Sequence, residues 1–145
     1  MKIVLQRVSS ASVKVDSKIV GRIEHGLLLL IGFSSTDTEE NILPTIEKIV
    51  KLRIFSDEEG KMNKSVLDVE GSMLLISQFT LYADTKKGNR PSFIEAARPE
   101  QAIPLYEFFI DEMRKRITKV ETGIFGADMK VELVNDGPVT IVFET

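Results

Sequence analysis

The stretch Leu74-Leu75-Ile76-Ser77-Gln78-Phe79-Thr80-Leu81 is followed by Tyr82-Ala83-Asp84. Five of its eight residues are apolar, which predicts a mostly buried β-strand. The same stretch carries the polar side chains of Ser77, Gln78 and Thr80. A buried hydroxyl or amide without a partner costs about 1–3 kcal/mol, so each of these groups should meet another protein group or a ligand.

Two interpretations of these polar groups follow. In the first, Ser77 and Thr80 bond nearby backbone and Gln78 lies on a wetter face of the sheet. In the second, the strand ends at the wall of a pocket and presents Ser77, Gln78, Phe79 and Thr80 to a substrate. The rest of the chain has to decide between them.

Length and composition predict an ordinary globular domain. The 145 residues suit one domain, 1–145, which can bury about two thirds of its unfolded surface. A hydrophobic content of 43% and a charged content of 28% argue against a disordered chain. We therefore expect no second domain.

The residue types that are missing restrict the chemistry. The sequence has no cysteine, which excludes disulfides, a thiol nucleophile and a cysteine-based zinc site. Its only histidine, His25, precedes an apolar run and is an unfavourable candidate for a catalytic triad. We expect neither a metal nor a cofactor.

Charge and hydropathy limit the classes of partner that this protein can bind. A formal net charge of −3 argues against a broad DNA- or RNA-coating surface, but it allows a grip on one end of an RNA. The apolar run Leu27–Ile31 is too short to cross a bilayer, and the N-terminus lacks the layout of a signal peptide. We expect a cytoplasmic protein that binds neither DNA nor membranes.

The N-terminal half predicts strands and one helix. Residues 2–8, 11–15 and 19–23 have the composition of strands, with a hairpin turn at 16–18, and Leu27–Phe33 predicts a central strand that is covered on both faces. Asp37 stands three residues before a glutamate as a capping signal, and helical spacing follows over about 38–52. Because Pro44 is tolerated only in a first turn, the regular helix is expected to start later than that signal. Residues 55–61 predict an acidic turn, and residues 65–69 a connector.

The C-terminal half predicts a second helix and a hairpin. Pro99 opens a helix whose apolar face we assign to the core. Alternation around Val131 predicts a strand, 135–137 a turn, and Val139–Phe143 the returning strand. Pro138 removes a ladder donor where that strand begins, which indicates an edge strand or rigid turn, or else a cis peptide bond that points the carbonyls of Gly137 and Pro138 outward.

This order of elements predicts an α+β fold: a mainly antiparallel, barrel-like sheet joined by hairpins, with two helices packed on it. The loop 85–92 directly follows the Ser77–Thr80 strand. It carries three cations, Lys86, Lys87 and Arg90, which are candidate contacts for a bound anion, although such clusters are more often solvated faces.

Several of these segments resemble one known family over essentially the whole chain. They are Gln6-Arg7-Val8-Ser9-Ser10-Ala11-Ser12-Val13, Ser77-Gln78-Phe79-Thr80, Gly88-Asn89-Arg90-Pro91-Ser92-Phe93, Gly123-Ile124-Phe125-Gly126-Ala127-Asp128-Met129 and Asn135-Asp136-Gly137-Pro138-Val139-Thr140. Together they resemble the D-aminoacyl-tRNA deacylases. Asn89 stands where a basic residue is expected in many relatives, so the resemblance extends to the activity but not to a phosphate contact at this position.

The resemblance implies a hydrolase that releases D-amino acids, and glycine mischarged on tRNA-Ala, from the 3′ end of tRNA. It implies a homodimer in which the Gly137-Pro138 motif, with a cis bond, reaches the partner's site and rejects L-aminoacyl groups. The catalytic strand residues would be Ser77, Gln78, Phe79 and Thr80. Arg7 would hold the Gly137-Pro138 pair, Phe125 would border the pocket, and Lys86, Lys87 and Arg90 would contact tRNA phosphates.

Two mechanisms stay open. Thr80 could attack the ester, but no histidine is an obvious partner to activate it. The interpretation we favour uses the 2′-hydroxyl of the substrate, with backbone N–H groups around Phe79 and Thr80 stabilising the oxyanion. Two other functions compete: a non-catalytic binder of RNA 3′ ends that stacks the base on Phe79 or Phe125, and a Thr-dependent esterase that needs no RNA.

Overall fold

The computed structural model describes residues 1–145. The elements follow the order β1 (Lys2–Val15), β2 (Lys18–Ile23), β3 (Gly26–Gly32), α1 (Glu39–Lys51), β4 (Phe55–Ser56), β5 (Met62–Lys64), β6 (Ser72–Ser77), the 3-10 helix η1 (Phe79–Tyr82), α2 (Pro99–Arg114), β7 (Val120–Thr122) and β8 (Lys130–Glu144). No helix of the structure is long and apolar enough to cross a membrane.

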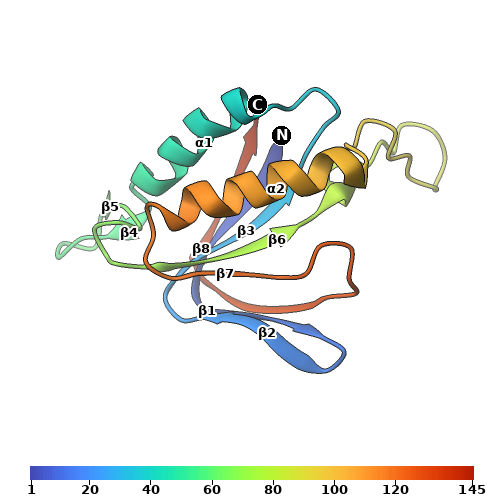
Figure 1. The fold of residues 1–145 in the computed structure, drawn as a ribbon. Helices are drawn as coiled ribbons and strands as arrows, with labels where there is room; N and C mark the ends of the chain where they lie inside the picture. The colour runs from blue at the N-terminus through green and yellow to red at the C-terminus, as the bar shows by residue number, and fades with distance from the viewer.

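One six-stranded sheet organises the fold. Its order is β2-β1-β3-β6-β7, and β8 pairs with β1. Strand β1 is antiparallel to β2, β3 and β8, whereas β3–β6 and β6–β7 are parallel pairs. The predicted α+β fold with a mainly antiparallel sheet and two helices is therefore confirmed. The expectation of hairpins alone is wrong, because α1 and α2 each lie in a crossover between parallel strands (Figure 1).

The sheet curls into a nearly closed barrel because β1 pairs with two different strands along the same edge. Its first half pairs with β3 and its second half with β2. Strand β2 thereby approaches β7 so closely that a Cβ at Gly21 would lie 2.8 Å from the carbonyl oxygen of Thr122. The interior of the curl is a small apolar cluster, formed by Val8, Ala11, Val13, Ile23, Leu28, Leu74 and Ile76.

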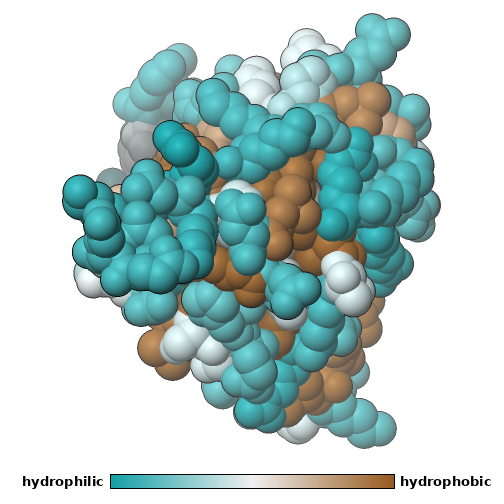
Figure 2. Space-filling model, turned by 90° about the vertical axis from the view of Figure 1, so that its left-hand side faces the viewer, coloured by the Kyte–Doolittle hydropathy of each residue, from teal (hydrophilic) through white to brown (hydrophobic).

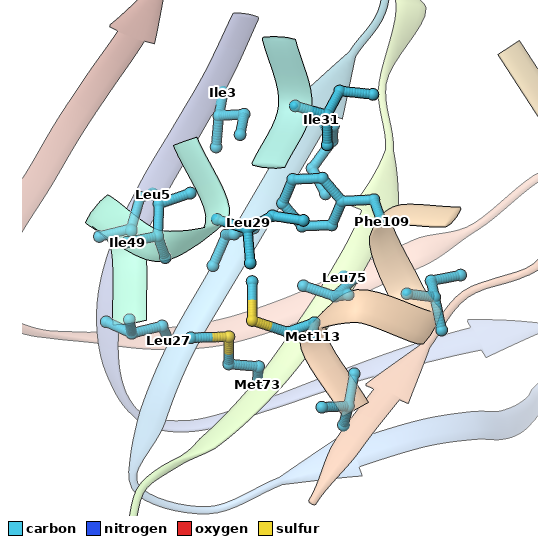
Figure 3. Close-up of a cluster of buried hydrophobic side chains, with 14 of the residues drawn as sticks. Ile3, Leu5, Leu27, Leu29, Ile31, Ile49, Met73, Leu75, Phe109 and Met113 are labelled. Carbon is cyan, nitrogen blue, oxygen red and sulfur yellow. The ribbon is translucent and has the colours of Figure 1, made fainter. Parts of the chain in front are cut away.

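The larger core lies between the sheet and the two helices, which lie side by side over one face (Figure 1). Leu27, Leu29 and Ile31 of β3 belong to this core, while Leu28 faces the barrel interior. Figure 3 shows Leu27, Leu29 and Ile31 in one cluster with Ile49 of α1 and Phe109 of α2. The continuous apolar run in β3 therefore reflects burial on both faces, as predicted.

Helix α1 begins differently from the prediction. Its N-cap is Thr38, whose N–H donates to Asn41 Oδ1 at 2.8 Å. Asp37 instead accepts a 2.7 Å hydrogen bond from the N-terminal ammonium of Met1. Pro44 lies inside the helix, contrary to the expected later start. Its missing bond would reach the carbonyl of Glu40, an exposed residue where water can take its place.

The predicted C-terminal hairpin is wrong. Residues Lys130–Glu144 form one strand, β8, which runs beside β1 along its whole length. The register steps from Gln6↔Thr140 to Val8↔Asn135, so residues 136–139 bulge out of the ladder. The Gly137–Pro138 peptide bond within this bulge is cis. A turn signal in the sequence has become a bulge because the long partner strand continues opposite it.

A small hairpin, β4–β5, forms around the acidic turn predicted at 55–61, and its second strand, which was not predicted, ends just before the connector predicted at 65–69. Asp57 shapes its turn by accepting hydrogen bonds from the N–H groups of Glu59 and Lys61, both at 2.9 Å. Hydrophilic side chains dominate the view of the molecule from this end, with apolar ones visible between them (Figure 2).

Candidate functional site

Strand β6 ends at Ser77, four residues earlier than predicted. The Gln78 N–H still donates to the Ile31 carbonyl at 2.7 Å, and the chain then turns into η1. The expectation that Phe79, Thr80 and Leu81 continue the strand is therefore wrong. Ser77 and Gln78 are half-buried, whereas Phe79 and Thr80 are exposed. The polar residues thus lie where the strand leaves the sheet.

A cavity of about 290 Å³ opens at this point. Its walls come from the ends of β3 and β6, the start of η1, the first turn of α2 and the residues before it, the segment between β7 and β8, and the start of β8. The lining residues include Ile31, Gly32, Phe33, Ile76, Ser77, Gln78, Phe79, Ala97, Ala102, Phe125, Gly126, Ala127, Asp128, Met129 and Val131. The structure therefore brings together Ser77, Gln78, Phe79 and Phe125, four of the residues that the sequence singled out.

Gly32 allows the first turn after β6 to approach β3. A Cβ at position 32 would lie 2.7 Å from the carbonyl oxygen of Gln78 and 3.3 Å from Cβ of Leu81. A contact that short with backbone forces a displacement. Sequence reasoning missed this residue, because the close approach depends on the β3–β6 pairing and no local pattern reveals it.

Tyr106 of α2 supports two walls of the cavity. Its hydroxyl donates to the Leu75 carbonyl of β6 at 2.8 Å, and its ring packs against Phe125 with the centroids 6.0 Å apart. Burial raises the pKa of Tyr106. The Gly123 N–H donates to the same carbonyl at 3.2 Å, so the segment that carries Phe125 is attached to the strand that carries Ser77.

Thr80 has no base beside it. Its Oγ1 accepts a hydrogen bond from Gln78 Nε2 at 2.5 Å, and the structure gives it no other side-chain partner. An amide N–H cannot take the hydroxyl proton. His25 lies away from the cavity, edge-on to Phe55 with ring centroids 5.1 Å apart. Asp128 is the one carboxylate on the cavity wall, and it pairs with Lys130 at 2.9 Å.

Arg7, Gly137 and Pro138 do not line this cavity. Arg7 is buried and donates from Nε to the Asp136 carbonyl at 2.9 Å and from Nη1 to the Ile54 carbonyl at 2.6 Å. Asn135 Oδ1 accepts from the Val139 N–H at 2.8 Å and so ties the two ends of the bulge together. Gly137 and Pro138 themselves are exposed at the surface.

Lys86, Lys87 and Arg90 lie on an exposed loop that projects beyond the sheet (Figure 1). Paired backbone hydrogen bonds between Asp84 and Ser92, at 2.8 and 3.0 Å, close the base of this loop. None of the three cations forms an ion pair in the structure. No group of three or more His, Cys, Asp or Glu side chains is arranged to hold a metal ion.

Comparison with known proteins defines the class. The family model described as D-Tyr-tRNA(Tyr) deacylase matches residues 4–144. The structure of a protein described as c-Myc DNA Unwinding Element Binding Protein is similar at a TM-score of 0.94 and 43% identity, covering 100% of this chain and 99% of its own. A structure described as a probable eukaryotic D-amino acid tRNA deacylase has a TM-score of 0.85 and 20% identity, and the match covers 98% of this chain and 97% of that chain.

The chain therefore belongs to the D-Tyr-tRNA deacylase family, as the resemblance of its motifs predicted. It is a D-aminoacyl-tRNA deacylase, a hydrolase of translational proofreading whose substrate is aminoacyl-tRNA.

Proposed function

We propose that this deacylase cleaves both D-aminoacyl-tRNA and glycine mischarged on tRNA-Ala, and that it works as a homodimer in which Gly137 and Pro138 of one subunit complete the cavity of the other. The observation that carries the proposal is the separation of these parts: the cavity lies at the end of β6, while the Gly137–Pro138 bulge is exposed on β8. The proposed substrate is made and used where proteins are synthesised, so we also propose a cytoplasmic location.

The bulge has the stiffness that selection between enantiomers requires. Arg7 fixes the carbonyl before Gly137, and Asn135 fixes the N–H after Pro138. Asn135 Nδ2 also donates to Thr140 Oγ1 at 3.0 Å, which joins the bulge to the regular ladder. Four residues held from both ends can present their carbonyls in a fixed direction to a neighbouring subunit.

Fixed carbonyls explain rejection of the L form. D- and L-aminoacyl esters differ only in the arrangement around Cα, so a selective site must fix the ester, the amino group and one further direction. Carbonyls that accept hydrogen bonds from the amino group of the D form collide with the side chain of the L form. A thousandfold preference requires only about 4 kcal/mol. Glycine has no side chain to collide, so the same device admits it.

We propose that the chemistry depends on the substrate's own 2′-hydroxyl. The Thr80 hydroxyl has a side-chain hydrogen bond only with Gln78, and no base lies beside it to activate it as a nucleophile. Phe79 and Thr80 are the first residues of η1, where backbone N–H groups lack acceptors within the helix. These donors can stabilise the oxyanion while the 2′-hydroxyl activates water or assists the ester. Ser77 and Gln78 then position the terminal nucleotide, and Lys86, Lys87 and Arg90 contact tRNA phosphates.

The first experiment measures release of tyrosine from D-Tyr-tRNA and L-Tyr-tRNA, with the wild type beside Thr80→Ala. We expect release of the D form alone, and retention of most activity in the variant. The same tRNA ending in 2′-deoxyadenosine, charged on its 3′-hydroxyl, should react at least tenfold more slowly, because general acid–base assistance contributes about 10²–10⁴-fold. Loss of activity in Thr80→Ala with full activity on the deoxy substrate would identify Thr80 as the nucleophile.

The same assay separates the competing functions. A non-catalytic binder of RNA ends would release neither enantiomer, and a Thr-dependent esterase would cleave simple D-tyrosine esters as fast as the tRNA. Gly-tRNA-Ala is the third substrate, and we expect it to be cleaved because its Cα carries no side chain.

Mixing of two defective variants tests the role of the dimer. Ala127→Trp fills the cavity, and deletion of Gly137 and Pro138 removes the selecting bulge. If the bulge acts on the partner, the mixed dimer has one site with an intact cavity and an intact bulge, and D-selective activity returns after subunit exchange. If D over L selectivity stays absent from mixed dimers whose formation is verified by mass, the bulge acts only within its own subunit.

A further inference from the structure

An exposed apolar surface continues outward from the cavity mouth. Phe79 lines the cavity but leaves 55% of its surface exposed. Phe93 meets it edge-on, with the ring centroids 5.1 Å apart. The next residue, Ile94, is 90% exposed, more than any other large apolar residue of the chain. We refer to Phe79, Phe93 and Ile94 as the apolar step.

The backbone holds this step in place from both sides. The Ala96 N–H donates to the Phe93 carbonyl at 3.1 Å, which closes a turn with Ile94 near its tip. The Ala97 N–H donates to the Phe33 carbonyl at 2.8 Å and so attaches the turn to the end of β3. At 90% exposure the Ile94 side chain contributes little to the packing of this chain, and turns ordinarily favour Gly, Pro, Asn, Asp or Ser at such a position.

A basic loop precedes Phe93 and Ile94 of the step in the chain, and the exposed Glu95 follows them. The loop 85–91 ends two residues before Phe93 and contains Lys86, Lys87 and Arg90 but no acidic residue. These cations have no ion-pair partner in the structure, although the whole chain carries a net charge of −3. An apolar surface flanked by unpaired cations complements single-stranded nucleic acid, in which unstacked bases alternate with phosphates.

We propose that the apolar step binds the one or two unpaired nucleotides that precede the terminal adenosine of tRNA. Their bases pack on Phe93 and Ile94, and their phosphates face the basic loop. The inference rests on the proposed function, because it requires the terminal adenosine to occupy the adjoining cavity. It assigns to Phe93 and Ile94 a role in distinguishing a tRNA end from a free aminoacyl nucleoside.

The test compares two substrates in the full-length protein. The first is D-Tyr-tRNA and the second is 3′-O-D-tyrosyl-adenosine, which lacks the preceding nucleotides. We expect Ile94→Ser to reduce the ratio of kcat/KM for tRNA to kcat/KM for the nucleoside ester by about tenfold, mainly through KM, since burial of an isoleucine side chain against a base has about that magnitude. Met62→Ser is the matched control: Met62 is also exposed, on β5 at the other end of the molecule, and should leave the ratio unchanged.

A binding measurement without turnover keeps the two proposals distinguishable. Fluorescence anisotropy of a labelled RNA ending in ACCA should show weaker binding to Ile94→Ser than to the wild type, and unchanged binding to Met62→Ser. If the wild type fails to cleave D-Tyr-tRNA, the proposed function fails while this measurement still reports on the step. Normal cleavage with an unchanged substrate ratio and unchanged RNA affinity in Ile94→Ser would overturn the inference alone. A dimer that dissociates in Ile94→Ser would also overturn it and assign the step to a contact between subunits.

Discussion

The Nε atom of Arg7 donates a 2.9 Å hydrogen bond to the carbonyl oxygen of Asp136, the residue before Gly137. The same guanidinium donates to the Ile54 carbonyl in the segment between α1 and β4. One buried side chain on β1 therefore connects the bulge of β8 to the body of the protein. The two carbonyls bind two different nitrogens of the planar guanidinium, so the single ammonium group of a lysine cannot reproduce both hydrogen bonds.

Replacement of Arg7 should impair selection more than catalysis. In Arg7→Lys we expect the ratio of D-Tyr-tRNA to L-Tyr-tRNA hydrolysis to fall at least tenfold, because the bulge gains freedom to move away from the L side chain. The free energy of unfolding should fall by about 1.5–3 kcal/mol, the value of a hydrogen bond to a charged group. Arg22→Lys, at an exposed position, is the control and should change neither quantity. An unchanged enantiomer ratio in a destabilised Arg7→Lys protein would leave Arg7 a structural role only.

Gly32→Ala should damage the site while the core stays folded. The new methyl group must displace the Gln78 carbonyl, and a misplacement of about 1 Å at a catalytic site can cost 10²-fold in rate. We expect kcat/KM for D-Tyr-tRNA to fall at least tenfold. Gly21→Ala introduces a similar clash with Thr122, away from the cavity. It should lower the melting temperature with little change in kcat/KM, so equal kinetic losses in the two variants would contradict the assignment of Gly32 to the site.

The buried pair between the Met1 ammonium and Asp37 should make stability depend on acid. Burial alone raises the pKa of Asp37, but hydrogen bonds from the ammonium, the Ser34 N–H and Asn41 outweigh it and hold the pKa below its ordinary value of 3.8. The unfolded state therefore binds this proton first, and the stabilisation is present above pH 3.8 and is lost as the pH falls through the lower folded-state pKa. Denaturant unfolding between pH 2 and 6 should show this loss in the wild type and a smaller one in Asp37→Asn.

Removal of either partner of that pair should be costly at neutral pH. Both side-chain exposures are at most 1%, and loss of one member of a buried ion pair costs about 3–5 kcal/mol. We expect Asp37→Ala to lose about that much unfolding free energy at pH 7. The exposed Lys2–Glu144 pair provides the comparison: Glu144→Gln should cost at most about 1 kcal/mol. Equal losses in the two variants would show that burial does not strengthen the dependence on Asp37.

Tyr106→Phe should lower the stability of the protein modestly, because it removes the hydroxyl but keeps the aromatic ring. The variant removes one hydrogen bond to the Leu75 carbonyl, which keeps the bond from Gly123, so we expect a loss of about 1 kcal/mol in unfolding free energy.

The raised pKa of Tyr106 means that the unfolded state releases this proton first, near its ordinary value of 10.0, so the wild type loses stability as the pH rises above that value. The slope of stability against pH between 9 and 11 should be shallower in Tyr106→Phe. An identical slope would indicate that the buried hydroxyl does not titrate with unfolding.

Local patterns in the sequence predicted the elements better than their pairing. The run Leu27–Phe33 predicted a strand covered on both faces because burial leaves a direct mark on residue type. Periodicity carries no record of which strands are neighbours, so the parallel β3–β6 pairing was missed. The segment from Asn135 to Gly137 has the composition of a turn, yet it became a bulge because β1 extends opposite it. Tertiary context decided between two conformations that suit the same residues.

The site could be predicted in part, because some of its residues form a local motif and others depend on long-range contacts. Ser77, Gln78 and Phe79 form one continuous motif, and the structure places all three at the cavity. Phe125 followed only from the family resemblance, since nothing in its local sequence connects it to a strand nearly fifty residues earlier. Gly32 and Tyr106 act through long-range contacts, namely the carbonyls of Gln78 and Leu75. Such residues become visible only when the three-dimensional neighbours are known.

Strands β3 and β6 run in the same direction and end at one edge, where their carboxyl ends lead into the segments that surround the cavity. Most residues of those segments, unlike the strands behind them, contribute nothing to the two buried clusters. A change of amino acid in the connections can therefore alter which aminoacyl group is accepted without a large change in folding free energy. In this architecture, the residues that hold the fold together and the residues that select the substrate lie in different segments. Relatives can therefore differ in substrate while they keep the same sheet.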